Sequence, residues 1–189
     1  IDKTNNDFKI IRYSTSLNED VLGKLQRGAY CSYRIFFDPL TFNYTDPAKG
    51  PFKLEDYRKK SATLGKDVVL PGNLGNSPSR YVTAIMDRGT MEKGVSQQEN
   101  ADPTFTQSQA LMRYNTIFSQ KLSMTVPSNT NLEAGDIIEC EFALTSAKNT
   151  IDTEQSGLYM IKELCHHFDP TGSYTSLTLI KDTFGTKAK

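Results

Sequence analysis

The residues most suited to chemistry are Cys165-His166-His167, because thiolate and imidazole groups bind zinc and take part in nucleophilic catalysis. The flanking residues predict a strand, and adjacent strand residues point to opposite faces, so His166 and His167 cannot hold one metal without a bulge. Cys165 and His167 share a face, with Cys140 as a speculative third ligand. Two ligands are not a zinc site, and no catalytic signature surrounds Cys165. We therefore favour strand residues at a subunit surface, and we expect no metal and no cofactor.

Carboxylates form the second candidate group. Glu139 and Glu141 are two residues apart on one face of a predicted strand, and Glu163 could lie across from them. Paired carboxylates can hydrolyse glycosidic bonds. The same pattern arises from a solvated face, or from charges that meet Lys or Arg of a neighbouring subunit, and we favour that interpretation. We expect no catalytic residue here and no enzymatic activity, and a carboxylate-dependent peptidoglycan hydrolase stays as an alternative.

Two further stretches could bind phosphate or nucleic acid. The loop Pro71-Gly72-Asn73-Leu74-Gly75-Asn76 lacks the Lys-Ser/Thr ending of a phosphate-binding loop, and no helical pattern follows it. A basic-aromatic patch comprises Lys53, Tyr57, Arg58, Lys59 and Lys60, diluted by Glu55 and Asp56. We interpret the first as a turn and the second as a mixed surface.

Composition likewise gives no sign of a specialised binding protein. The 189 residues suggest one domain or two small ones, and the 22 basic and 22 acidic residues cancel, which argues against bulk attraction to nucleic acid. Cys31, Cys140 and Cys165 are odd in number and widely spaced, as in proteins of a reducing compartment. There is no recognisable signal peptide and no apolar run of transmembrane length. Because the chain starts with Ile1, we expect a fragment or a processed product.

The elements that must position these residues are clearest between Gln107 and Leu144. A helix is predicted over 107–115, opened by a capping box of Thr106 and Gln109. Its expected buried stripe is Ala110, Leu111, Tyr114 and Ile117. A strand over 120–126 follows, with Leu122, Met124 and Val126 on its core face and Pro127 at its end. Gly135 can supply a positive φ before a second strand over 137–144.

Two more strands complete the C-terminal region, over 157–168 and 173–182, joined by a turn at Pro170-Thr171-Gly172. The first has apolar residues on both faces: Leu158, Met160, Leu164 and Phe168 on one, and Tyr159, Ile161 and Cys165 on the other. A strand covered on both sides, or a bulge, would explain this. The four strands predict an antiparallel meander that closes, with help from the N-terminal half, into a small barrel or rolled sheet.

The N-terminal half is less regular. Strands are predicted over 8–13, 29–38, 67–70 and 80–86, and a helix that starts from a Ser16/Glu19 capping box ends at Gly28. Residues 51–63 fit a short helix or an irregular strand, and 64–79 and 87–103 are long polar loops. The predicted fold is mainly β (α+β), with a β-rich portion over 1–103 and a helix plus meander over 104–189. The two are expected to form one composite barrel.

Two runs resemble baseplate hub proteins of contractile-tailed bacteriophages: "LMRYNTIFSQKLSMTVPSNTNLEAGDIIECEF" and "SGLYMIKELCHHFDPTGSYTSLTLIKDTFG". The upstream "LQRGAYCSYRIFFDPLTFNYTD" is similar to a stretch in the same proteins. The resemblance covers about 107–184 and, with lower specificity, 25–46.

This resemblance implies a hub of tube-like β-barrels, trimeric, with two barrels per subunit in pseudo-sixfold symmetry, similar to type VI secretion spike proteins. It implies a virion protein of the tail baseplate, assembled in the host cytoplasm, that joins the tail tube to the central spike. It brings no catalytic residues, and the chain is shorter than a full hub. No membrane or nucleic-acid partner is expected. A small-barrel module that binds carbohydrate or nucleic acid is the main alternative.

Overall fold

The computed structural model describes residues 9–17, 20–39, 42–44, 50–60, 63–86, 103–146 and 150–186. The chain forms two compact units, neither of which is continuous in sequence. Unit 1 contains residues 1–19, 63–68 and 117–189, and unit 2 contains residues 20–62 and 69–116. None of the described helices has the length and apolar character needed to cross a membrane.

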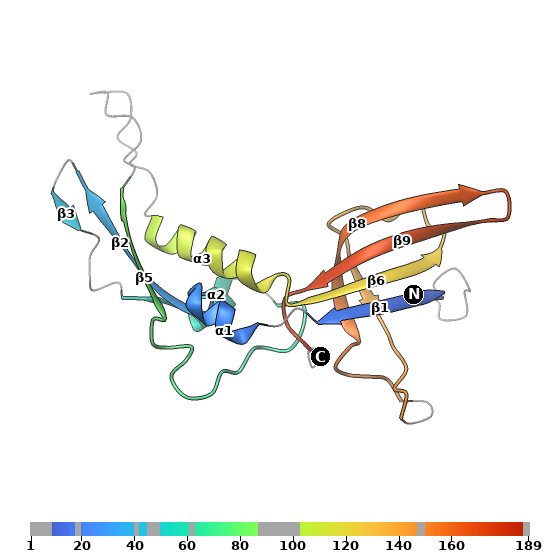
Figure 1. Ribbon diagram of the computed structural model, residues 1–189, viewed down its shortest axis with the longest axis horizontal. Coiled ribbons are helices and arrows are strands. Elements are labelled where there is room, and N and C mark those ends of the chain that lie inside the picture. The colour runs from blue at the N-terminus through green and yellow to red at the C-terminus, as the bar shows by residue number, and fades with distance from the viewer. Residues whose placement is uncertain are drawn as a thin grey trace. The chain divides into compact units, whose positions relative to one another are not determined.

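Unit 1 is built on one curled antiparallel sheet of five strands (Figure 1). In spatial order the strands are β1 (Arg12–Leu17), β6 (Gln120–Pro127), β9 (Gly172–Lys181), β8 (Gly157–Asp169) and β7 (Ile137–Cys140). The predicted fold class, mainly β with an antiparallel sheet that curls and a few short helices, is confirmed. Pro127 is the last residue of its strand, as predicted, since it cannot donate to the ladder.

The meander order was wrong. Strand β6 pairs with β9 on one side and with β1 on the other, whereas the 137–144 strand pairs with β8 alone. The first and last of the four predicted strands are therefore central neighbours. The core-facing residues explain why β6 pairs with β9, because Leu122 lies opposite Leu179 and Met124 lies opposite Leu177. The most apolar strands therefore meet in the middle of the sheet.

The core of unit 1 lies on one face of this sheet. It comprises Leu122, Met124, Val126, Cys140, Phe142, Tyr159, Ile161, Leu177 and Leu179. The predicted core face of β6 is thus confirmed. Strand β7 ends at Cys140, four residues before the prediction, although Phe142 still turns into the core. Gly135 has φ of +102°, the left-handed value expected for the entry into β7.

A bulge in β8 explains the two apolar faces of that strand. Ile161 lies opposite Leu179 and Glu163 lies opposite Thr178, so Lys162 is an extra residue without a counterpart on β9. Before the bulge the odd-numbered residues face the core, and after it Leu164 packs against the core instead. The predicted bulge is confirmed, and the predicted face sets are wrong beyond position 162 for that reason.

Unit 2 is a four-stranded sheet with helices beside it. Its strands are β2 (Cys31–Asp38), β3 (Asn43–Tyr44), β4 (Phe52–Lys53) and β5 (Arg80–Ile85), and its helices are α1 (Val21–Gln26), α2 (Leu54–Lys60) and α3 (Pro103–Thr116). Strand β2 is central, antiparallel to β3 and β4 and parallel to β5. The predicted strands over 29–38 and 80–86 are confirmed. The segment 67–70 is not a strand.

Both predicted capping boxes were wrong. Ser16 lies inside β1, and Asp20 caps α1 instead by accepting a hydrogen bond from Gly23 N at 2.9 Å. The helix ends at Gln26, and the predicted stop, Gly28, follows its C-cap Arg27 with φ of +74°. Helix α3 starts at Pro103, so Thr106 lies within it rather than at its cap.

The buried stripe of α3 was also wrong. Among the side chains of α3 that the structure describes, Ser108, Met112 and Thr116 are buried, four positions apart, whereas Tyr114 is 72% exposed. The helix turns the smaller polar residues of its sequence inward around Met112, a choice that apolar periodicity alone does not reveal. The predicted strand over 8–13 begins instead at Arg12, and most of the predicted 87–103 loop lies outside the described residues.

Candidate functional site

The two histidines of β8 make different contacts with their cross-strand neighbours. His166 Nδ1 lies 2.9 Å from Oγ1 of Thr175, its partner on β9. The His167 ring stacks on its own partner, Tyr174, with centroids 4.5 Å apart and planes 13° apart. Each imidazole is thus held by one neighbour on the adjacent strand. Across the described residues, no three His, Cys, Asp or Glu side chains gather closely enough to hold a metal ion.

The cysteines differ in exposure. Burial raises the pKa of the Cys140 thiol to about 12, and burial also raises the pKa of Cys31. Both thiols therefore stay protonated and unreactive at neutral pH. Cys165 is exposed, and its sulfur lies 3.9 Å from the carbonyl oxygen of His166. Cys140 lies on the core face of the sheet and Cys165 on the opposite face, so the two thiols cannot bind the same metal ion.

The candidate carboxylates lie in and just after β7, at Glu139 and Glu141, and on β8, at Glu163. Glu139 lies opposite Leu158, and β8 pairs with β7 only over residues 157–160. Glu163 lies beyond that segment, opposite Thr178, and is paired with Lys162 at 3.3 Å. The expectation that Glu163 lies across from Glu139 was therefore wrong, because β7 is too short to reach it. Glu139 and Glu163 therefore do not form a facing pair of the kind used in glycoside hydrolysis, and Glu141 lies just beyond the end of β7.

The remaining sequence candidates have structural explanations. The 71–76 loop is a turn in which Asn73 O accepts from Asn76 N at 3.0 Å and from Ser77 N at 2.9 Å. In the basic-aromatic stretch Tyr57 is only 4% exposed, so its ring is not available to stack on a base. This segment forms β4 and α2 rather than a continuous basic surface.

A polar groove that the sequence reasoning missed lies on the sheet face of unit 1 opposite the core. Strand register sets two rows across four strands: Ser14, Ser123, Thr178 and Glu163 in one, and Arg12, Thr125, Ser176 and Cys165 in the other. These residues line a hollow of about 680 Å³. Five of the eight are Ser or Thr, with one Arg and one Glu, so the groove is hydroxyl-rich and close to neutral.

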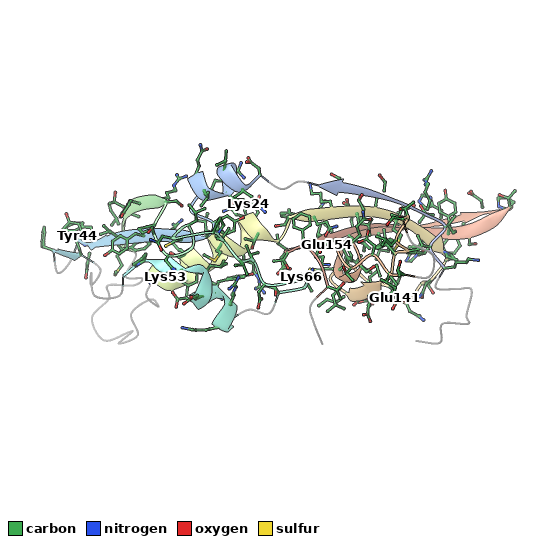
Figure 2. All side chains as sticks on the ribbon, turned by 90° about the horizontal axis from the view of Figure 1, so that it is seen from below. Lys24, Tyr44, Lys53, Lys66, Glu141 and Glu154 are labelled. Carbon is green, nitrogen blue, oxygen red and sulfur yellow. The ribbon has the colours of Figure 1, made fainter. Side chains whose placement is uncertain are left out.

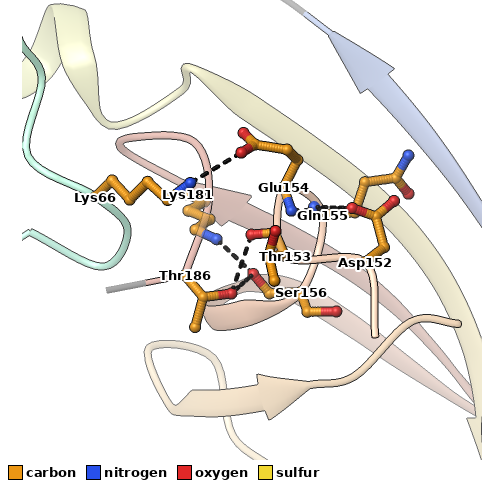
Figure 3. Close-up of polar contacts among 8 residues, drawn as sticks. All are labelled: Lys66, Asp152, Thr153, Glu154, Gln155, Ser156, Lys181 and Thr186. Atoms are coloured by element: carbon orange, nitrogen blue, oxygen red, sulfur yellow. Dashed lines mark hydrogen bonds and ion pairs between the residues drawn. The ribbon is translucent and has the colours of Figure 1, made fainter. Parts of the chain in front are cut away.

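A buried lysine lies at the end of the same sheet. Lys181 is fully buried, and its Nζ donates to Ser156 O at 3.0 Å (Figure 3). Its Nζ also lies 4.9 Å from the centre of the Tyr159 ring. Burial lowers the pKa of Lys181. Thr186 Oγ1 donates to the same Ser156 oxygen at 3.0 Å, so the C-terminal segment is fastened to the loop before β8.

The ion pair beside this lysine joins two further segments. Lys66 Nζ lies 2.8 Å from Glu154 Oε1 (Figures 2 and 3), and the backbone N–H of Lys66 donates to Phe184 O at 2.9 Å. Leu64 N donates to Asp182 Oδ1 at 2.9 Å. The strictly alternating run that ends in Leu177, Leu179 and Lys181 was the available signal that this lysine faces inward.

Unit 2 has an exposed apolar surface, here called the aromatic face, on the side of β2 away from Arg34. It comprises the exposed Phe42, Tyr44, Tyr81 and Ile85 and the half-buried Tyr33, Ile35 and Phe37. Rings meet at centroid distances of 5.9 Å (Tyr33–Tyr81) and 5.3 Å (Phe37–Tyr44). Tyr81 is 67% exposed and Ile85 is 72% exposed, and Figure 2 shows Tyr44 projecting at the end of the sheet.

Comparison with known proteins gives one weak sequence match. A 74-residue segment is 26% identical to "Probable baseplate hub protein gp334" of Vibrio phage KVP40, covering 39% of this chain and 18% of that protein. The matched segment therefore spans less than a fifth of that relative's length. No family model matches the chain. The match supports a relation to phage tail and baseplate proteins, which is the coarser part of the predicted resemblance.

A solved structure is also similar over most of the chain. It is the tail protein from Neisseria meningitidis MC58, with 12% sequence identity and a TM-score of 0.41, and the similarity covers 95% of this chain and 42% of that one.

Proposed function

We propose that this chain is a structural protein of a phage tail baseplate, a hub or hub-like subunit that links the tail tube to the central spike. It works by homo-oligomeric assembly, as a trimer, and not by catalysis. The observation that carries the proposal is the match to a probable baseplate hub protein, at 26% identity over 74 residues. On this proposal the chain is a virion component, assembled in the host cytoplasm.

The aromatic face supports a role in assembly. Large apolar side chains that are contiguous and exposed mark protein interfaces, because their burial on association is favourable. Tyr81, Ile85 and Tyr44 are each at least two-thirds exposed. A neighbouring chain that covers this face would remove their surface from water, and it would therefore stabilise the assembly more than any single surface ion pair.

Outer strands give a second means of assembly. Strand β5 pairs only with β2 among the described strands, and its sequence Arg-Tyr-Val-Thr-Ala-Ile contains one charge and no proline. In unit 1, β1 is an outer strand with the similar sequence Arg-Tyr-Ser-Thr-Ser-Leu. Such edges offer unpaired backbone groups to a strand of another chain. Pairing between two different edges can close into a ring, as a cyclic trimer requires.

The polar groove fits the same proposal as a surface turned toward a lumen, the tube or the spike. Its short hydroxyl side chains bond water well, and its single Arg and Glu leave little net charge. A neutral, hydrated wall holds neither a polyanion nor an unfolded polypeptide strongly. This gives the polar face a purpose without a catalytic group.

The test is the association state of the purified chain at high concentration, measured by light scattering and negative-stain microscopy. We expect a trimer or ring for the parent chain. Tyr81→Lys, on the aromatic face, should shift the population to monomer, whereas Val69→Lys, at an 87% exposed residue outside that face, should not. A parent chain that is strictly monomeric, with no ring in micrographs, would contradict the proposal.

The groove also favours one alternative, a small-barrel module that binds carbohydrate or nucleic acid. Its volume of about 680 Å³ is within the range of ligand sites, which are typically about 300–1,000 Å³. A bound ligand would raise the melting temperature of the chain, in proportion to its concentration over its dissociation constant. A glycan or oligonucleotide that does so, with loss of the effect in Ser123→Leu, would favour this alternative over assembly.

A further inference from the structure

Two arginines of unit 2, Arg34 and Arg80, lie on the same face of its sheet. In the parallel register of β2 and β5, Arg80 lies opposite Ser32 and Arg34 lies opposite Val82. The two arginines are thus diagonal neighbours on adjacent parallel strands, about 8 Å apart by strand spacing and rise, within the reach of two long side chains. Helix α3 contacts β2 on this face, where Arg34 Nη1 donates to Gln107 Oε1 at 3.5 Å.

The electrostatics of this pair are unfavourable as they stand. Burial, and then the neighbouring positive charge of Arg80, lower the pKa of Arg34. Arg34 Nε is buried and has no hydrogen-bond partner. The ion pairs Lys66–Glu154 and Lys162–Glu163 lie in unit 1 and do not involve these arginines. A buried donor without an acceptor, next to a like charge, is unfavourable, and an anion bound nearby would offset this cost.

The chemistry of the three side chains defines what fits. Each guanidinium presents several N–H donors in a rigid planar fork, and the Gln107 amide adds an NH₂ donor. Two donor forks and an amide can surround one oxyanion through charge-assisted hydrogen bonds, which are short and strong. An oxyanion there would accept hydrogen bonds from the two guanidinium groups and offset the repulsion between their charges.

We propose that Arg34, Arg80 and Gln107 form an oxyanion site that receives the carboxylate of an acidic side chain from a neighbouring protein chain. A carboxylate fits better than a nucleic-acid backbone, because a single arginine pair is not a basic stripe and the whole chain has no net charge. The identity of the donor as a neighbouring chain rests on the proposed role in assembly. The anion site itself depends only on unit 2.

The site can be tested on the isolated chain by NMR of the arginine Nε–Hε groups. Acetate and inorganic phosphate are titrated separately at constant ionic strength against chloride. We expect a saturable shift of the Arg34 Nε–Hε resonance, retained in Arg12→Gln, which alters an exposed arginine of unit 1. Arg80→Gln should weaken acetate binding at least tenfold without changing the melting temperature, since Arg80 is exposed. No shift in the parent, or equal binding by Arg80→Gln, would overturn the site.

The source of the anion is tested by competition. A short glutamate-containing peptide and a single-stranded oligonucleotide of equal charge are compared for their effect on the same resonance. Stronger binding of the peptide supports the carboxylate assignment, and stronger binding of the oligonucleotide overturns it. A chain that forms trimers but binds neither acetate nor phosphate contradicts the site and leaves the assembly proposal standing. A monomeric chain that binds acetate supports the site and contradicts assembly.

Discussion

Deletion of Lys162 tests the bulge on which the faces of β8 depend. Ile161 and Glu163 are opposite Leu179 and Thr178, which are consecutive residues of β9. Removal of Lys162 therefore leaves every remaining pair in place and restores a regular ladder. Tyr159, Ile161 and Leu164 keep their positions toward the core.

The expected cost is small. The Lys162 side chain is exposed, and its contact with Glu163 is a surface ion pair, of a kind that contributes about 0–1 kcal/mol. We expect the free energy of unfolding to change by less than about 1 kcal/mol, because no buried side chain is lost. Lower local twist is the main structural change, since bulges increase the twist of a strand.

Deletion of Ser123 is the matched control. Ser123 is also an exposed strand residue, but β6 has no bulge, so the deletion turns Met124 and Val126 from the core to the polar face. Loss of two buried side chains costs roughly 3–6 kcal/mol at about 1.5–3 kcal/mol each, a large part of a domain's stability.

Urea unfolding followed by far-UV circular dichroism measures both deletions. NOE contacts between Ile161 and Leu179, and between Glu163 and Thr178, check the register directly. If deletion of Lys162 costs as much as deletion of Ser123, or if these contacts disappear, the reasoning about the extra residue is refuted.

Three further predictions follow from local geometry. A Cβ at Gly65 would lie 2.6 Å from Thr183 O, so Gly65→Ala should destabilise the chain by about 1–3 kcal/mol in urea unfolding. The control is Gly75→Ala, where the nearest atom to the new Cβ lies at 3.7 Å, and it should change stability by less than about 0.5 kcal/mol. Burial places the pKa of Lys181 in the folded chain below its unfolded value of 10.5. Between the folded pKa and 10.5 the unfolded chain binds more protons than the folded chain, so the contribution of Lys181 to stability rises with pH. Thermal melts at several pH values should show that Lys181→Met lacks this rise; parallel curves for both chains would contradict it. A maleimide reagent should modify Cys165 rapidly and the two buried thiols only on unfolding, as mass spectrometry would detect.

The C-terminal sheet could be predicted from sequence because alternation is a local signal. Leu122, Met124 and Val126 alternate with polar residues, and the structure buries all three. The pairing order could not be predicted in the same way. It depends on which apolar faces meet, and β6 and β9 are far apart in sequence, so nothing local shows that Leu122 faces Leu179.

Helix α3 shows a different limit. Apolar periodicity predicts a stripe that includes Tyr114, yet the helix buries Ser108 and Thr116 instead. The Thr116 hydroxyl donates to Met112 O at 2.8 Å, so part of this buried polarity is satisfied within the helix. Small residues whose hydrogen bonds are internal can face a sheet closely, and hydrophobicity scales do not register that advantage.

The arginine site was beyond sequence analysis for a topological reason. Arg34 and Arg80 are separated by a long segment that includes β3, β4 and α2, and only the parallel pairing of β2 with β5 makes them neighbours. Parallel strands need long connections, so their pairing carries no hairpin signal in the sequence. The Cys165-His166-His167 pattern, in contrast, stands out in sequence, but its neighbouring side chains point to opposite faces of β8. His166 contacts Thr175, whereas Cys165 lines the polar groove. Adjacency along a strand separates side chains, whereas adjacency across strands brings them together, so a site in a β protein is set by register more than by motif.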